Sequence, residues 1–86
     1  MPRVFIPPQM RELSGGLTEV EVAGQSLRSV IAALDAQYPG MAARLCQNDA
    51  VAPGLAVSID GDVVRGLSAK VSPTSEVHIL PAIGGG

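Results

Sequence analysis

The sequence of 86 residues has few aromatic side chains and almost no cysteine. Phe5 and Tyr38 are its only aromatic residues, and Cys46 is its only cysteine. A lone cysteine excludes an internal disulfide. The core must therefore pack from Val, Leu, Ile and Ala, which an apolar content of 47% allows. A chain of this length predicts one domain with a modest core.

The sequence also lacks a large excess of either charge and has no long apolar run. Six basic and eight acidic residues are scattered along the chain and give a formal net charge of −2. Nucleic-acid binders need a basic stripe that neutralises phosphates, so we expect no nucleic-acid partner. The apolar run near the N-terminus is cut by Pro7 and Pro8. It is too short for a signal peptide or a membrane span, so we expect a cytoplasmic protein with no membrane partner.

The first part of the chain predicts two strands. Residues 3–6 form a β-branched and aromatic run that ends at Pro7, which is typical of a strand. Residues 18–22 alternate valine or threonine with glutamate, which is typical of a half-buried strand. Ser14-Gly15-Gly16 is a turn signal between them, so we expect the two strands to form a hairpin across this glycine turn.

The next segment has the period of an amphipathic helix. Ser26 is a suitable N-cap, and Pro39-Gly40 ends the helix because proline disfavours helical geometry in the residue before it. Met41 and Leu45 indicate a second short helical turn, and residues 46–54 are expected to form a loop. The apolar stripe of the main helix consists of Leu27, Val30, Ile31 and Leu34.

Three more strands follow. Residues 55–59 and 63–64 flank Asp60-Gly61, which is typical of a hairpin turn. The last strand covers residues 77–80, and Pro81, which has no amide donor, is expected to end the ladder. One apolar helix stripe and matching strand faces predict two layers, with a helix on a sheet, in the α+β class.

None of the reactive side chains in this domain predicts a catalytic or metal site. Cys46 and His78 are too few for a structural zinc site, and we expect a partly buried thiol and a sheet-surface histidine. Gly15-Gly16 lacks the spacing of a phosphate-binding loop and leads into a strand. Asp60 and Asp62 flank a turn glycine, which turn preference alone explains. We expect no metal and no cofactor bound by this chain.

The end of the chain is the remaining candidate. We divide the sequence into a domain of residues 1–81 and a flexible glycine tail of residues 82–86. At about 3.3–3.6 Å per residue, this tail extends about 17 Å. Glycines carry no side chain, so a narrow channel can close around their backbone. Either the terminus is inert, or its carboxylate reacts inside a partner enzyme.

Together, these features resemble the ubiquitin-like sulfur carriers, which are small β-grasp proteins that end in Gly-Gly. The resemblance covers nearly the whole chain and is strongest to the branch that serves cysteine biosynthesis. It implies a β-grasp fold, in which a mixed sheet of about five strands carries one main helix on one face. The matching segments are Ile6-Pro7, Arg11–Gly16, Ala23–Leu27, Val30–Leu34, Tyr38–Gly40, Arg44-Leu45, Val64–Leu67 and Ser75–Gly85.

The resemblance also implies a mechanism. A ubiquitin-activating-type adenylyltransferase would use ATP to adenylate the carboxylate of Gly86, and a sulfurtransferase or other donor would supply the sulfur of a thiocarboxylate. The acceptor would be a cysteine synthase-like enzyme or, alternatively, the large subunit of molybdopterin synthase or a thiazole synthase. Apolar residues on the exposed sheet face would form the docking patch. The residues gripped by partners would be Leu80, Pro81, Ala82, Ile83, Gly84 and Gly85.

Three alternatives stay open from the sequence. The family pattern ends in two glycines whereas this chain has three, so Gly86 either reacts itself or is trimmed first. The glycine end could instead form an isopeptide bond to a target protein. Lys70 is the only lysine, which nearly excludes branched chains in which one copy of the protein is attached to a lysine of another. Finally, the domain could be an interaction module with an inert terminus.

Overall fold

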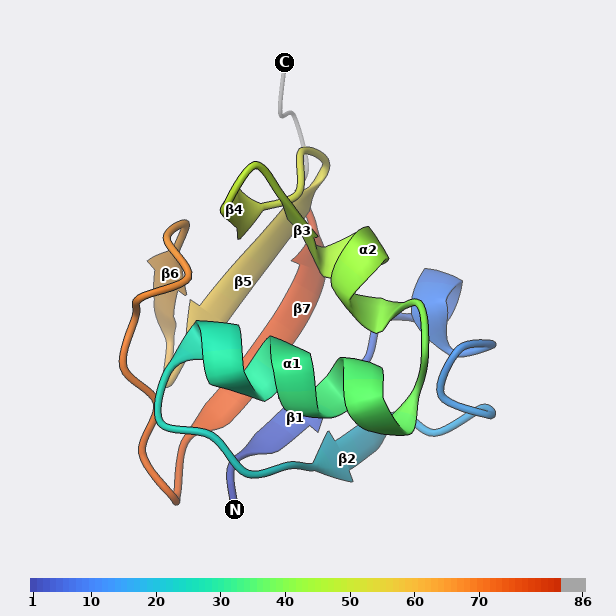
Figure 1. Ribbon diagram of the computed structural model, residues 1–86, viewed down its shortest axis with the longest axis horizontal. Helices are drawn as coiled ribbons and strands as arrows, with labels where there is room; N and C mark the ends of the chain where they lie inside the picture. Colours follow the sequence, from blue (N-terminus) through green and yellow to red (C-terminus); the bar gives the residue numbers. More distant parts are fainter. Residues whose placement is uncertain (83–86) are drawn as a thin grey trace.

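A five-stranded mixed sheet carries one main helix across a single face (Figure 1). The structure, a computed structural model, describes residues 1–82. The strand order is β2-β1-β7-β5-β6, in which β1 and β7 are parallel and every other neighbouring pair is antiparallel. The strands are β1 (Arg3–Phe5), β2 (Glu19–Glu21), β5 (Leu55–Ile59), β6 (Asp62–Val64) and β7 (Glu76–Pro81). They correspond to the five strands predicted from the sequence.

The main helix, α1 (Leu27–Gln37), begins where the sequence predicts. The Ser26 hydroxyl accepts a hydrogen bond from the Ser29 amide at 3.2 Å, and the Ser29 hydroxyl accepts one from the Ser26 amide at 3.0 Å. This reciprocal cap satisfies amides that the first helical turn leaves free. The predicted stripe is buried against the sheet, where its four residues meet Val4, Val57, Val77 and Ile79.

The connection between β1 and β2 differs from the predicted glycine hairpin. The two strands do pair, but a short 3₁₀ helix, η1 (Pro8–Met10), and a series of turns lie between them. Pro8 favours the start of a helical turn, and Met10 is only 2% exposed and anchors the segment to the core. The predicted turn at Gly15-Gly16 is present, with φ of 69° and 91°. The glycines therefore end a longer structured loop and do not join the strands directly.

The segment after α1 contains structure that we expected to be a loop. The predicted second helical turn is α2 (Met41–Leu45), with Met41 and Leu45 buried. It leads directly into a hairpin of β3 (Cys46–Gln47) and β4 (Ala50–Val51). Asn48 and Asp49 form its turn with φ of 55° and 61°. Asparagine and aspartate tolerate this left-handed conformation, which two-residue hairpin turns require.

The last strand is longer than predicted at both ends. It covers Glu76–Pro81, and Pro81 still stands opposite Leu55 in the antiparallel register. The amide of Ala82 then donates to the carbonyl of Gly54 at 3.0 Å. The ladder therefore ends at Pro81, as expected, and the bond from the next amide closes its last pair.

Candidate functional site

The C-terminal segment leaves the domain from the centre of the sheet. β7 lies between β1 and β5: it pairs with β1 from Glu76 to His78 and with β5 from Val77 to Pro81. Its last residues run beside the start of β5, next to the β3–β4 hairpin (Figure 1). The end of β7 is therefore held on one edge, by β5 and by the hydrogen bond from the Ala82 amide to the carbonyl of Gly54.

The strand alternates between two environments up to its end. Val77 and Ile79 are buried on the side that faces α1. Leu80 lies on the opposite side and is 46% exposed, and Pro81 is also exposed. Ala82 is partly buried. Leu80, Pro81 and Ala82, three of the residues predicted to contact a partner, thus lie together at one end of the sheet.

The predicted residues Ile83, Gly84, Gly85 and Gly86 lie outside the described residues. Their roles, and the proposed boundary between a domain of residues 1–81 and a tail of residues 82–86, stay predictions. Within the described part of the chain, Ala82 still belongs to the hydrogen-bonded sheet through Gly54.

The sheet face opposite α1 is divided into a charged half and a more apolar half. In the charged half, Arg3 lies 3.4 Å from a carboxylate oxygen of Glu19 and 3.2 Å from one of Glu76. Towards the end of β7, Leu80 stands opposite Ala56. Val63, on β6, is 67% exposed. Val63 stands opposite Ser58, level with His78, whereas Leu80 lies nearer the end of β7.

Phe5 and His78 form the middle of that face. Their rings stack with centroids 4.2 Å apart and planes inclined by 3°. His78 Nε2 lies 3.5 Å from a carboxylate oxygen of Glu76. The prediction of a sheet-surface histidine is confirmed, and the stack gives this residue a structural role that its position in the sequence did not reveal.

Cys46 is a half-buried thiol, as predicted, and its Sγ donates to the carbonyl of Ala42 at 3.0 Å. No group of three or more metal-ligating side chains occurs among residues 1–82. Asp60 adopts φ of 52° beside Gly61 in the predicted turn. Its carboxylate accepts from the Glu76 amide, which with the Ser75 hydroxyl holds the pKa of Asp60 below its usual value.

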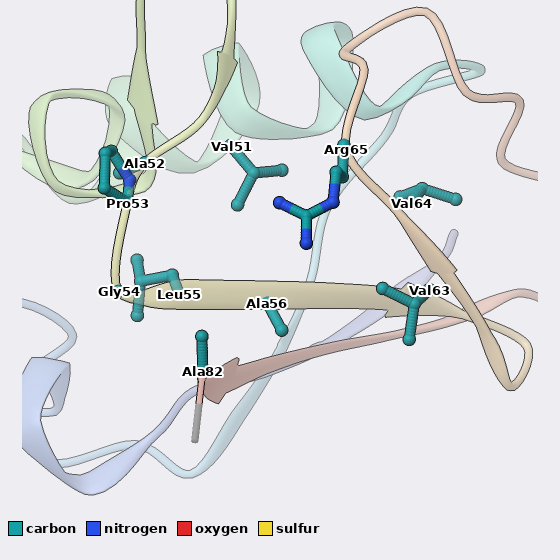
Figure 2. A pocket seen from close by; sticks show the side chains of 10 residues that line it. All are labelled: Val51, Ala52, Pro53, Gly54, Leu55, Ala56, Val63, Val64, Arg65 and Ala82. Atoms are coloured by element: carbon teal, nitrogen blue, oxygen red, sulfur yellow. The ribbon is translucent and has the colours of Figure 1, made fainter. Parts of the chain in front are cut away.

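A groove of about 460 Å³ lies beside Ala82 (Figure 2). It forms because β6 pairs with β5 only from Val57 to Ile59, so the first part of β5 has no partner on that side. After β6, the carbonyl of Arg65 instead accepts from the amide of Val51 on the β3–β4 hairpin at 3.0 Å. The groove is lined by Val51, Ala52, Pro53, Gly54, Leu55, Ala56, Val63, Val64, Arg65 and Ala82.

Sheet order, the single covering helix and the exit from a central strand define a β-grasp domain, as expected from the sequence. The chain belongs to the ThiS family, whose model matches residues 4–86. The part of the chain that the structure describes contains no helix long and apolar enough to span a membrane.

Relatives within this family are similar over almost their entire length. The chain is 34% identical over 91 residues to the sulfur carrier protein CysO of Mycobacterium tuberculosis (strain H37Rv), covering 96% of both chains. The same identity and coverage hold for the sulfur carrier protein CysO of Mycobacterium bovis. These matches agree with the resemblance to the cysteine branch.

Solved structures confirm the fold. The structure superposes with a TM-score of 0.91 on a chain of the Amycolatopsis orientalis BexX/CysO complex, at 29% identity and full coverage of both chains. The TM-score is 0.90 against Mycobacterium tuberculosis CysO, at 28% identity, with 96% of this chain and 100% of that chain covered. The small archaeal modifier protein 1 of Methanosarcina acetivorans gives a TM-score of 0.80 at 22% identity over 99% and 95% of the two chains, which is a likeness of fold alone.

Proposed function

We propose that this protein is a sulfur carrier whose C-terminal carboxylate, on Gly86, receives and donates the sulfur atom for cysteine biosynthesis. The observation that carries this proposal is the 34% identity, over nearly the full length of both chains, to proteins named sulfur carrier protein CysO. A terminus of three glycines that follows the central strand supports it. The protein acts as a carrier and co-substrate, and catalysis belongs to its partners.

Activation precedes sulfur transfer because a free carboxylate is a poor acyl donor. A carboxylate oxygen of Gly86 attacks the α-phosphorus of ATP, which forms an acyl-adenylate and releases pyrophosphate. Sulfide, or its equivalent from a sulfurtransferase, then attacks the carbonyl carbon and AMP leaves. The partner for the first step is a ubiquitin-activating-type adenylyltransferase, which binds the ATP.

The thiocarboxylate sulfur is then the nucleophile of the second partner, a cysteine synthase-like acceptor enzyme. It attacks an electrophilic carbon of the substrate held there and displaces the leaving group of that carbon. Water then hydrolyses the resulting thioester, which releases the thiol product and returns the carboxylate of the carrier. Leu80, Pro81 and Ala82 serve as the start of the inserted segment, because pairing with β5 and the bond from Ala82 to Gly54 hold them against the sheet.

Intact-mass measurement tests this proposal. The protein is incubated with ATP, sulfide and the adenylating enzyme encoded in the same genome, and its mass is expected to rise by the replacement of one oxygen with sulfur. A chain amidated at Gly86 is the matched control and is expected to keep its mass. If no adenylating enzyme of that genome produces the replacement, the protein is not a sulfur carrier of this kind.

A further inference from the structure

The groove beside Ala82 lies close to the segment that would enter an active site. Four residues follow Ala82 in the sequence, and at about 3.3–3.6 Å each they reach about 14 Å at most. An enzyme that surrounds the terminal carboxylate therefore brings its own surface within that distance of Ala82. Because Ala82 lines the groove, the groove is within reach of that enzyme surface.

Among residues 1–82, Arg65 is the only charged residue that lines this groove. Its guanidinium extends over β5 into the groove, between Val51 and Val64 (Figure 2). The other lining residues are apolar or glycine. A cation in such surroundings interacts more strongly with an opposite charge once a partner excludes water.

Each of the other arginines has a carboxylate or a backbone carbonyl as a partner within the domain. Arg3, Arg28 and Arg44 each lie 3.1–3.7 Å from a carboxylate oxygen. Arg11 donates to the carbonyl of Ile6 at 3.2 Å. Among residues 1–82, Arg65 has no carboxylate within ion-pair distance. A guanidinium without such a partner, within reach of the enzyme surface, is complementary to a carboxylate on that enzyme.

We propose that this groove receives an acidic side chain of the adenylating enzyme, which forms an ion pair with Arg65 next to the channel that takes the terminus. The inference rests on the proposed function and specifies the chemistry of one partner surface. The planar guanidinium binds a carboxylate through two parallel hydrogen bonds, so it fixes the orientation of the carrier as well as adding affinity. Apolar contacts from Val51 and Val63 would flank the ion pair.

The experiment measures ATP–pyrophosphate exchange by the adenylating enzyme as a function of carrier concentration. Arg65→Glu is expected to raise the KM for the carrier at least about tenfold, with kcat within about twofold, because a contact away from the reacting carboxylate supports association more than chemistry. Arg65→Lys is expected to keep much of the affinity. Raising NaCl from about 0.1 to about 1 M is expected to reduce the advantage of the native protein over Arg65→Gln.

Lys70→Glu is the matched control, since it makes the same change of charge at an exposed residue outside the groove. Its KM is expected to equal that of the native protein. Arg65 is exposed, so its variants should have the same melting temperature as the native protein. If Arg65→Glu lowers that temperature, Arg65→Gln serves in its place because it removes the charge without reversing it. An unchanged KM for Arg65→Glu overturns this inference alone. If the native carrier supports no exchange at all, the proposed function fails as well.

Discussion

The carboxylate of Asp60 accepts a hydrogen bond from the backbone amide of Glu76 at 2.9 Å. Its second oxygen accepts from the hydroxyl of Ser75 at 2.8 Å. The turn after β5 is thereby joined to the first residue of β7, the strand that carries the C-terminal segment. Both bonds favour the ionised carboxylate and lower the pKa of Asp60 from its ordinary value.

We therefore predict that Asp60→Asn destabilises the protein at neutral pH. Asparagine tolerates the left-handed backbone of this position, so the substitution removes the charge without adding backbone strain. A group whose pKa is lowered by folding contributes stability above its unfolded pKa and loses it as the pH falls through the folded pKa. The stability difference between the two proteins should thus be constant near pH 7 and shrink below about pH 4. Urea unfolding from pH 7 to pH 2 measures it, and a difference that persists unchanged at pH 2 would contradict the explanation.

A second prediction concerns Gly24, which packs closely against Val30 of α1. A Cβ at this position would lie 2.7 Å from Cγ2 of Val30 and 2.8 Å from its amide nitrogen. Val30 is fully buried and part of the helix, so it cannot move aside easily. Gly24→Ala should therefore lower the free energy of unfolding by about 1–3 kcal/mol. The control is Gly66→Ala, whose Cβ would meet nothing closer than 4.0 Å and should be close to neutral. Equal urea midpoints for the two variants would refute the prediction.

The main elements could be predicted from the sequence because each has a strong local signal. The helix stripe from Leu27 to Leu34, its Ser26 cap and the Asp60-Gly61 turn are all as expected. The β3–β4 hairpin was missed because its strands have only two residues each, which is too short for an alternating pattern to show. Its signal was Asn48-Asp49, a pair that tolerates the left-handed turn.

Other features depend on contacts between distant parts of the chain. The stack of Phe5 on His78 joins β1 to β7, and nothing in the local sequence of either residue indicates it. The groove at Ala82 arises because β6 stops pairing before it reaches the start of β5. Arg65 belongs to a segment that matches the family, but its position beside the end of β7 became visible only in the fold.

Leu80 leads to a prediction about partner binding. This side chain is exposed at the end of β7, and we expect the adenylating enzyme to bury it. Leu80→Thr should raise the KM for the carrier about tenfold, because burying a leucine side chain contributes about 1.5–3 kcal/mol. Threonine is a good strand former, so the free energy of unfolding should change little.

Leu17 is the matched control for Leu80. It is 48% exposed, close to the 46% of Leu80, but it lies in the loop before β2. Leu17→Thr should leave the KM unchanged in the same pyrophosphate-exchange assay. If the two variants behave alike, apolar contact at the end of β7 does not contribute to recognition.

The last prediction concerns whether the reacting carboxylate is that of Gly86 or that of Gly85. Removing Gly86 moves the carboxylate back along the tail by about 3.5 Å. If Gly86 reacts, this displacement takes the nucleophilic oxygen out of line with ATP, and adenylation should slow by about 100-fold or more. Gly86→Ala keeps the length of the chain and adds only a methyl group, so it separates the effect of length from that of side-chain bulk. Pyrophosphate exchange gives the rate for each variant, and intact mass identifies the terminus that gains sulfur. A chain that ends at Gly85 and reacts as fast as the native protein would show that Gly86 is removed before the carrier is used.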